Sequence, residues 1–219
     1  RENLLLFDKD KATRSELDRS ITVIAHELAH MWFGDLVTMK WWDGIWLNEA
    51  FASLMEVIAS YNTYPEFKQW NAMNMSRTAG FSIDSLENSR PVEFDVETPD
   101  QAEEMFDVLT YEKGSTVLRM FQMFIGEEAF QNGVEAYLNK FKFENTNSSD
   151  LWDALSEASN QPLNKILPFW IREKGYPFLQ VDCSNNFLTI KQKPFLLKNV
   201  DTDKTVSYTH LRAHETESN

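Results

Sequence analysis

The sequence predicts a mainly α-helical protein that ends in a short β-hairpin, and three observations support this fold class. Apolar residues recur at three- and four-residue spacing over most of the chain up to about residue 173. Gly175 and Pro177 then break the helical pattern. Beyond them, "FLQVD" and "FLTIKQ" alternate apolar and polar residues on either side of "CSNN", as the two strands of a hairpin do.

The first two predicted helices have recognisable limits. Residues 15–33 place apolar side chains on one face, with Ser15 before the pattern and Gly34 after it as a stop signal. The next stretch, "LVTMKWWDG", is predicted to be extended or looped and to close on a turn at Asp43 and Gly44. A second helix follows from about residue 48 to residue 61 and ends before Pro65.

The remainder of the chain divides into an irregular segment, more helices and the hairpin. Residues 75–97 are polar and are predicted to be irregular. Helices are predicted over residues 99–106, 110–125, 127–141, 149–159 and 162–173. Since the composition changes near Tyr176, we place a domain boundary there, with one domain over residues 1–175 and the start of a β-rich domain over residues 176–200.

Composition restricts the class of protein. Of the 219 residues, 42% are hydrophobic and 13% aromatic, so the chain can bury a core and is not a disordered tail. The net charge of −13 disfavours a nucleic-acid or anionic-membrane partner, because phosphates would be repelled, although it is also what a solvated acidic surface gives. No apolar run reaches about 18 residues, so no membrane span is predicted. The lone Cys183 allows no internal disulfide and leaves the redox compartment open.

The stretch "VIAHELAHMWFG" carries the strongest functional signal. His26 and His30 are four residues apart, so their side chains leave one helical face one turn apart and are able to bind a single zinc ion. Glu27 lies next to His26, beside the ligand face, where it is suited to accept a proton from a metal-activated water. The alternative is a core helix with hydrogen-bonded histidines.

A third metal ligand and a supporting carboxylate follow in the next helix. Glu49 opens that helix at "WLNEAF", and the 18 residues between it and His30 allow the second helix to pack back on the first. Glu56 lies two turns further along the same face. It is either a hydrogen-bond partner for a metal-binding imidazole or a surface carboxylate.

The stretch "HELAHMWFGDLVTMKWWDGIWLNEAFASLMEV" resembles the signature of the M1 zinc aminopeptidases, the gluzincin family of aminopeptidase N. Ala50 stands where that family usually has glycine. "FDVLTYEKGSTVL" is similar to the family segment that carries a catalytic tyrosine, which corresponds to Tyr111. "FWIREKGYPFLQV" is similar to the end of the helical lobe and the entry to a small β-sandwich, so the resemblance covers about residues 1–195.

This resemblance implies the helical lobe of a thermolysin-like metallopeptidase catalytic domain, without its N-terminal part, followed by the first strands of a small β-sandwich. It implies one zinc ion per chain held by His26, His30 and Glu49, with Glu27 as general base and Tyr111 as a hydrogen-bond donor to the oxyanion. The implied reaction removes amino-terminal residues from peptides with a free N-terminus.

The resemblance also implies that part of the machinery lies outside this sequence. The family's Gly-x-Met-Glu-Asn motif, whose glutamate holds the substrate amine, precedes a segment resembling "RENLLLFD". The chain therefore reads as a piece of a longer protein that is inactive by itself. Its compartment is left open with the cytoplasm favoured, and membrane attachment is not visible.

The sequence leaves two other functions open. The alternatives are a bifunctional aminopeptidase and epoxide hydrolase of the same family, and an inert module used for binding or structure. The aromatic residues Trp32, Phe33, Trp41, Trp42 and Trp46 are expected to form the core between the first two helices, and a wall of the substrate pocket is a second role open to them. Residues 201–219 form a tail of doubtful origin, in which the spacing of His210 and His214 is a chance pattern. Without the family resemblance, Tyr111 would be interpreted as a packing residue.

Overall fold

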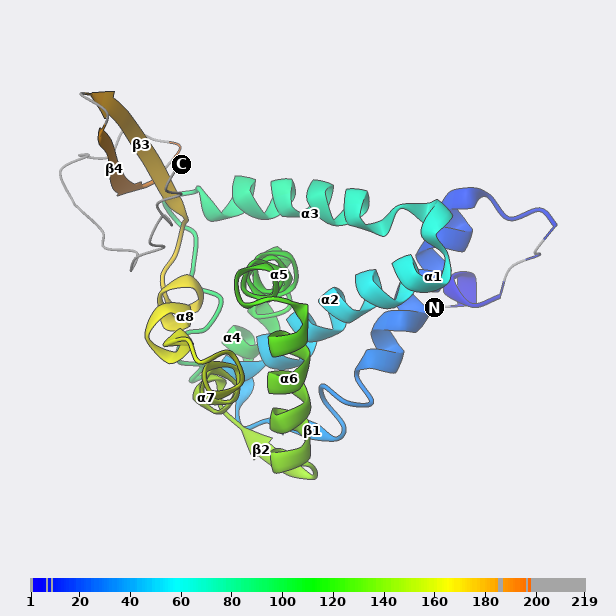
Figure 1. Cartoon of the computed structure of the whole chain (residues 1–219). Coiled ribbons are helices and arrows are strands. Elements are labelled where there is room, and N and C mark those ends of the chain that lie inside the picture. The colour runs from blue at the N-terminus through cyan, green and yellow to red at the C-terminus, as the bar shows by residue number, and fades with distance from the viewer. Residues whose placement is uncertain (1, 7, 9, 185–186, 196, 198–219) are drawn as a thin grey trace.

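The computed structural model describes residues 2–6, 8, 10–184, 187–195 and 197. Its elements are arranged in the order η1 (Glu2–Leu4), α1 (Arg14–Ala29), β1 (Val37–Met39), η2 (Trp42–Gly44), α2 (Trp46–Thr63), η3 (Pro65–Phe67), α3 (Gln69–Asp84), α4 (Pro99–Glu104), η4 (Leu109–Lys113), α5 (Gly114–Ile125), α6 (Glu127–Phe141), β2 (Glu144–Thr146), α7 (Ser148–Ser159), α8 (Leu163–Arg172), β3 (Pro177–Ser184) and β4 (Phe187–Pro194). The predicted mainly α-helical fold followed by β-strands is confirmed (Figure 1). Within the described residues, no helix combines the length and the apolar character needed to cross a bilayer.

Helix α1 begins at a capping box. The Thr13 side chain accepts a hydrogen bond from the backbone of Glu16, and the Glu16 side chain accepts one from the backbone of Thr13. Such reciprocal bonds satisfy backbone N–H groups that the first helical turn leaves without partners. The helix ends at Ala29, earlier than the predicted residue 33, because the chain turns through Gly34, whose φ of +143° suits a residue without a Cβ.

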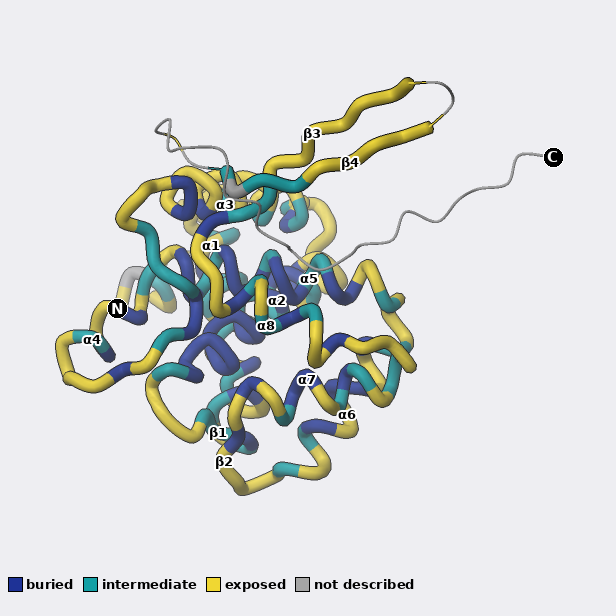
Figure 2. Tube along the Cα trace, turned by 90° about the vertical axis from the view of Figure 1, so that its left-hand side faces the viewer, coloured by how far each residue is buried: buried dark blue, intermediate teal, exposed yellow. Residues whose placement is uncertain are grey.

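Helix α2 occupies the centre of the helical body. One side of α2 packs against α1, and its buried face includes Trp46, Phe51 and Leu54, all with no accessible surface. Figure 2 shows this buried central region around α2 and α5. Burial of side chains of this size contributes about 1.5–3 kcal/mol each, so α2 is a firm support for any group that it carries.

The prediction that residues 75–97 are irregular is wrong for their first part, because α3 continues to Asp84. The stretch "NMSRTAG" is rich in residues with weak helix propensity, which is why its pattern suggests a loop. Tertiary packing overrides that preference: a Cβ at Gly80 would lie 3.6 Å from the Glu112 Cβ, so α3 runs close beside η4. Figure 1 shows α3 extending from the side of α1 toward the hairpin.

A short parallel ladder that the sequence pattern does not predict joins two distant parts of the chain. Strand β1 pairs with β2 in the register Val37 to Glu144 and Met39 to Thr146. The Tyr137 hydroxyl lies 2.6 Å from Thr146 Oγ1 and fixes the second strand to α6. The ladder fixes the loop that connects α1 to α2, and so helps to bring the two helices together.

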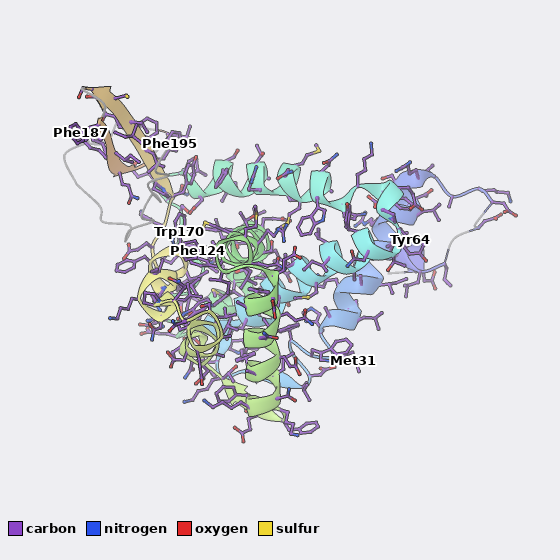
Figure 3. The ribbon with its side chains drawn as sticks, viewed as in Figure 1. Met31, Tyr64, Phe124, Trp170, Phe187 and Phe195 are labelled. Carbon is purple, nitrogen blue, oxygen red and sulfur yellow. The ribbon has the colours of Figure 1, made fainter. Side chains whose placement is uncertain are left out.

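The predicted hairpin is present and longer than expected. Strands β3 and β4 pair antiparallel from Pro177 and Pro194 to Ser184 and Phe187, so Cys183 lies in a strand rather than in the connection. The hairpin projects from the helical body, and its side chains are mostly exposed (Figures 2 and 3). Phe187, labelled in Figure 3, is 75% exposed. The division into two domains stays a prediction, and the tail with His210 and His214 lies outside the described residues.

The expected aromatic core between the first two helices is only partly formed. Phe33 and Trp46 are buried, and the Phe33 ring stacks on Phe51 with ring centroids 4.3 Å apart. Trp32, Trp41 and Trp42 are instead exposed at the surface. The prediction of a core role is wrong for these three residues because the chain leaves the helix before Trp32, so their positions no longer follow the face of α1.

Candidate active site

The first candidate ligand, His30, directly follows α1 and is fixed by the turn after it. Its Nδ1 lies 2.9 Å from the backbone oxygen of Phe33, which fits an Nδ1–H donor and leaves Nε2, which faces Glu49, to bind a metal ion once it gives up its proton. The buried Phe33 ring anchors this carbonyl, and a Cβ at Gly34 would approach the His30 carbonyl to 3.2 Å. The local turn therefore sets the orientation of the imidazole.

The second candidate ligand, His26, is oriented by a carboxylate from the neighbouring helix. Its Nδ1 lies 2.8 Å from Glu56 Oε2, while its Nε2 lies 3.3 Å from Glu49 Oε2. Imidazoles that bind metals usually donate their other N–H to a carboxylate or a carbonyl in this way. Of the two roles considered for Glu56, the structure supports the hydrogen-bond partner.

The third candidate ligand, Glu49, lies in the first turn of α2 and completes a three-sided cluster. Its Oε2 is 3.3 Å from Nε2 of both His26 and His30, and one ligand atom from each of the three residues lies within 4.8 Å of the other two. Tetrahedral zinc at about 2.0–2.1 Å from its ligands places them roughly 3.3 Å apart. The ligand atoms of His26, His30 and Glu49 therefore fit a metal ion in both chemistry and spacing.

The electrostatics of the cluster favour a cation at its centre. Burial alone would lower the pKa of His26, yet hydrogen bonds to Glu49 and Glu56 and the charges of both carboxylates raise it to about 9. Burial opposes ionisation of Glu49, but the hydrogen bonds from His26 and His30 lower its pKa to about 2. The hydrogen bond to Glu49 also raises the pKa of His30. Glu49 therefore stays ionised and attracts positive charge to this point.

Tyr111 reaches the same cluster from η4. Its ring stacks on His26 with centroids 6.1 Å apart, and its hydroxyl hydrogen-bonds Glu49. Burial, followed by the charge of Glu49, raises the pKa of Tyr111, and the charge of Glu27 acts in the same direction. The phenol therefore remains protonated and able to donate. The Glu27 side chain is exposed, and it directly follows His26, whose imidazole belongs to the cluster.

The structure brings His26, His30, Glu49 and Tyr111 into one cluster, with Glu27 close enough for its charge to act on Tyr111, and it adds supports that the sequence does not indicate. Two of these are the Phe33 carbonyl that holds His30 and the π-helical backbone of η4 around Tyr111. A π-helical turn leaves no periodic signature in so short a stretch, although such turns are frequent at functional sites. The turn after His30 was detectable only through Gly34 as a stop signal.

Comparison with known proteins identifies the family. A family model described as the Peptidase family M1 domain matches residues 1–170. This match covers more than half of the chain, and the chain belongs to peptidase family M1. Because M1 is a metallopeptidase family, membership implies a metal ion, for which the cluster of His26, His30 and Glu49 offers the ligands.

Several curated relatives are named as aminopeptidases. The chain is 41% identical over 196 residues to Aminopeptidase M1-A of Oryza sativa subsp. japonica, covering 90% of this chain and 22% of that protein. It is 41% identical over 201 residues to Puromycin-sensitive aminopeptidase of Caenorhabditis elegans, covering 90% and 21%. It is 42% identical over 207 residues to Probable aminopeptidase 1 of Sulfurisphaera tokodaii, covering 94% and 26%. The chain thus spans about a fifth to a quarter of the length of these relatives.

Proposed function

We propose that the whole protein is a zinc aminopeptidase that removes amino-terminal residues from peptides, and that this chain supplies its metal site. The observation that carries the proposal is the set of three ligands from α1, the turn after it and α2, with Glu27 and Tyr111 beside it. The names of the relatives supply the substrate class. Preference for the terminal amine rests on those names alone.

The donor set favours one zinc ion per chain. Two imidazoles and one carboxylate leave a fourth tetrahedral position open, as in catalytic zinc sites. A bound zinc ion acts as a Lewis acid that makes water more acidic and polarises a carbonyl group. A purely structural module is disfavoured because structural zinc sites are usually closed by four cysteine or histidine ligands. The epoxide-opening alternative stays a prediction.

The residues of this chain have distinct roles in the proposed reaction. The Glu27 carboxylate accepts a proton from the attacking water and passes it to the nitrogen of the leaving amine. The Tyr111 hydroxyl donates a hydrogen bond to the former carbonyl oxygen as that oxygen becomes negative. Glu56 and the Phe33 carbonyl hold the imidazoles of His26 and His30 in the orientation that ligation needs.

The substitution Glu27→Gln in the whole protein tests this assignment. It keeps the size of the side chain and removes the base, so kcat should fall by about 10²–10⁴-fold while zinc content stays at the wild-type level. Hydrolysis of an aminoacyl anilide and metal analysis on the same preparation measure both quantities. Glu135→Gln, on the exposed face of α6, is the matched control and should change neither. Loss of zinc from the Glu27 variant, or a retained rate, would refute the role of Glu27 as base.

A further inference from the structure

Tyr111 lies in a backbone conformation that needs support. The five residues of η4 form a π-helical turn between Val108 and the start of α5. The N–H of Gly114, the first residue of α5, bonds back to the carbonyl of Leu109. Such turns are rare, and they persist only where the surrounding structure holds them. The position of the Tyr111 hydroxyl therefore depends on what fixes the two ends of η4.

The N-terminal end of η4 is held by Asp107. Its Oδ1 accepts hydrogen bonds from the backbone N–H of Leu109 at 2.9 Å and of Thr110 at 3.1 Å. The same oxygen pairs with Arg90 Nη2 at 2.6 Å, and that nitrogen also lies 3.1 Å from Thr110 Oγ1. Arg90 thus ties the start of the turn to the irregular segment after α3.

The C-terminal end of η4 is held by a more deeply buried pair. Lys113 Nζ lies 2.9 Å from Asp84 Oδ2, and the two side chains are only 8% and 2% exposed. The same ammonium donates to the carbonyl oxygens of Glu173 and Gly175, each at 3.1 Å. The other oxygen of Asp84 accepts from the Gly175 N–H at 2.8 Å. Since an ammonium has three protons, every donor of Lys113 is used.

The backbone after this pair also presses on α2 beside a candidate metal ligand. A Cβ at Gly114 would lie 2.7 Å from the Cβ of Ala50, closer than real Cβ contacts. Ala50 directly follows Glu49, whose carboxylate receives the Tyr111 hydrogen bond. A shift of η4 at its Lys113 end would therefore displace Tyr111 from Glu49 and from the proposed oxyanion position.

We propose that Lys113 and Asp84 are positioning residues for Tyr111: their buried ion pair locks the π-helical turn to the end of α3 and to the segment that leads into β3. This inference rests on the proposed function, because it concerns the alignment of the proposed oxyanion donor. In this proposal, the junction between the helical body and the hairpin helps to align Tyr111 with the reacting groups.

The test must avoid a mere failure to fold. Removing Lys113 alone would leave Asp84 charged and buried without its cation, whereas replacing both members of a buried pair is tolerated far better. The double substitution Lys113→Met with Asp84→Asn keeps the side-chain volumes and keeps an acceptor for the Gly175 N–H. Ser156→Ala is the control, because it removes hydrogen bonds of α7, to the Trp152 carbonyl oxygen and from the Asn164 N–H, away from η4.

A double-mutant cycle in the whole protein separates positioning from stability. The double substitution should lower kcat at least about tenfold with little change in KM, since a misplacement near 1 Å can cost about 10²-fold. In the Tyr111→Phe background it should lower kcat no further. The control should leave kcat unchanged. The positioning role would be overturned if the double substitution lowered kcat equally in the wild-type and Tyr111→Phe backgrounds, or in neither. It would also be overturned if the control lowered kcat by the same factor.

Two further measurements make the outcome specific. In the zinc-loaded and the chelator-treated protein alike, the fluorine NMR signal of fluorotyrosine at position 111 should shift in the double variant and stay in place in the control. An unchanged signal would overturn the inference without reference to activity. If Tyr111→Phe itself leaves kcat unchanged, the proposed oxyanion role fails and the positioning role fails with it. If Tyr111→Phe lowers kcat as expected but the double substitution lowers kcat by the same further factor in that background, only the positioning role is refuted.

Discussion

Two carboxylates that lie near the first turn of α2, Glu49 and Glu93, are almost equally buried, with 9% and 8% of their surface exposed. Glu93 is fully occupied by donors from its own chain. Arg172 donates to its Oε1 from Nε at 2.9 Å and from Nη2 at 2.7 Å, and Oε2 accepts from Trp46 Nε1 at 3.0 Å and from the Ser148 hydroxyl.

The neighbours of Glu49 are of another kind. Its Oε2 lies 3.3 Å from two imidazole nitrogens, and its third partner is the hydroxyl of Tyr111. No permanently charged cation is among these partners in the described structure, while Glu93 has the guanidinium of Arg172. Imidazoles can exchange a proton for a metal ion, whereas a guanidinium stays charged and offers no lone pair.

The comparison shows how to tell a structural carboxylate from a metal-binding one by its partners rather than by its burial. A buried carboxylate with its own guanidinium is complete and contributes to stability. A buried carboxylate whose partners are imidazoles, which can exchange a proton for a metal ion, offers a site for a cation from solution. Substitutions at the two sites should therefore separate stability from metal binding.

The largest expected effect on stability is at Glu93. The substitution Glu93→Gln keeps the shape but weakens the bonds to Arg172 and leaves one buried donor of Trp46 or Ser148 poorly paired. Hydrogen bonds to charged groups contribute about 1.5–3 kcal/mol, and the loss should fall in that range. Urea unfolding of the 219-residue chain measures it, with zinc content as the second readout. A stable variant that had lost its zinc would reverse the proposed division between the two carboxylates.

A smaller effect, on metal affinity, is expected at Glu56. The substitution Glu56→Gln removes the carboxylate that orients His26 but none of the ligands. Loss of such a partner typically costs about 10–100-fold in metal affinity. Competition with a zinc chelator gives the ratio of dissociation constants. An affinity equal to that of the wild type would return Glu56 to the role of a surface carboxylate.

The smallest effect is expected at Thr13, where α1 begins, because this residue lies at the opposite end of the helix from His26 and His30. Thr13→Ala removes the capping hydrogen bond and should cost about 1 kcal/mol of stability. Zinc affinity should stay unchanged, because His26 and His30 are held from α2 and from the turn after α1. A thermal melt together with zinc competition checks both values. A large drop in affinity would mean that fraying of α1 reaches the site.

The sequence predicts the local features of the site better than its long-range supports. His26, His30 and Glu27 follow from helical spacing alone, since positions four residues apart share a face. Glu49 needs the further assumption that α2 folds back on α1. Tyr111 is predicted only by the family resemblance, because one tyrosine at the start of a helical pattern is more simply a packing residue.

The supports were missed because the partners are distant in sequence. Lys113 meets the carbonyl of Gly175, and Glu93 meets Arg172, 79 residues away. Neither pair leaves a periodic pattern in its own segment. The end of α3 and the β1–β2 ladder were missed for the same reason: packing on η4 and pairing with a remote strand override weak local preference.

The most direct test of the account is the zinc content of the purified 219-residue chain and of two variants. We expect one zinc ion per folded chain, loss of that ion in His30→Ala, and full retention in Glu93→Gln, because only the first variant loses a ligand. Metal analysis after gel filtration, with circular dichroism to confirm folding, gives the three numbers. Equal zinc content in the wild type and in folded His30→Ala would contradict the assignment of His26, His30 and Glu49 as the metal site.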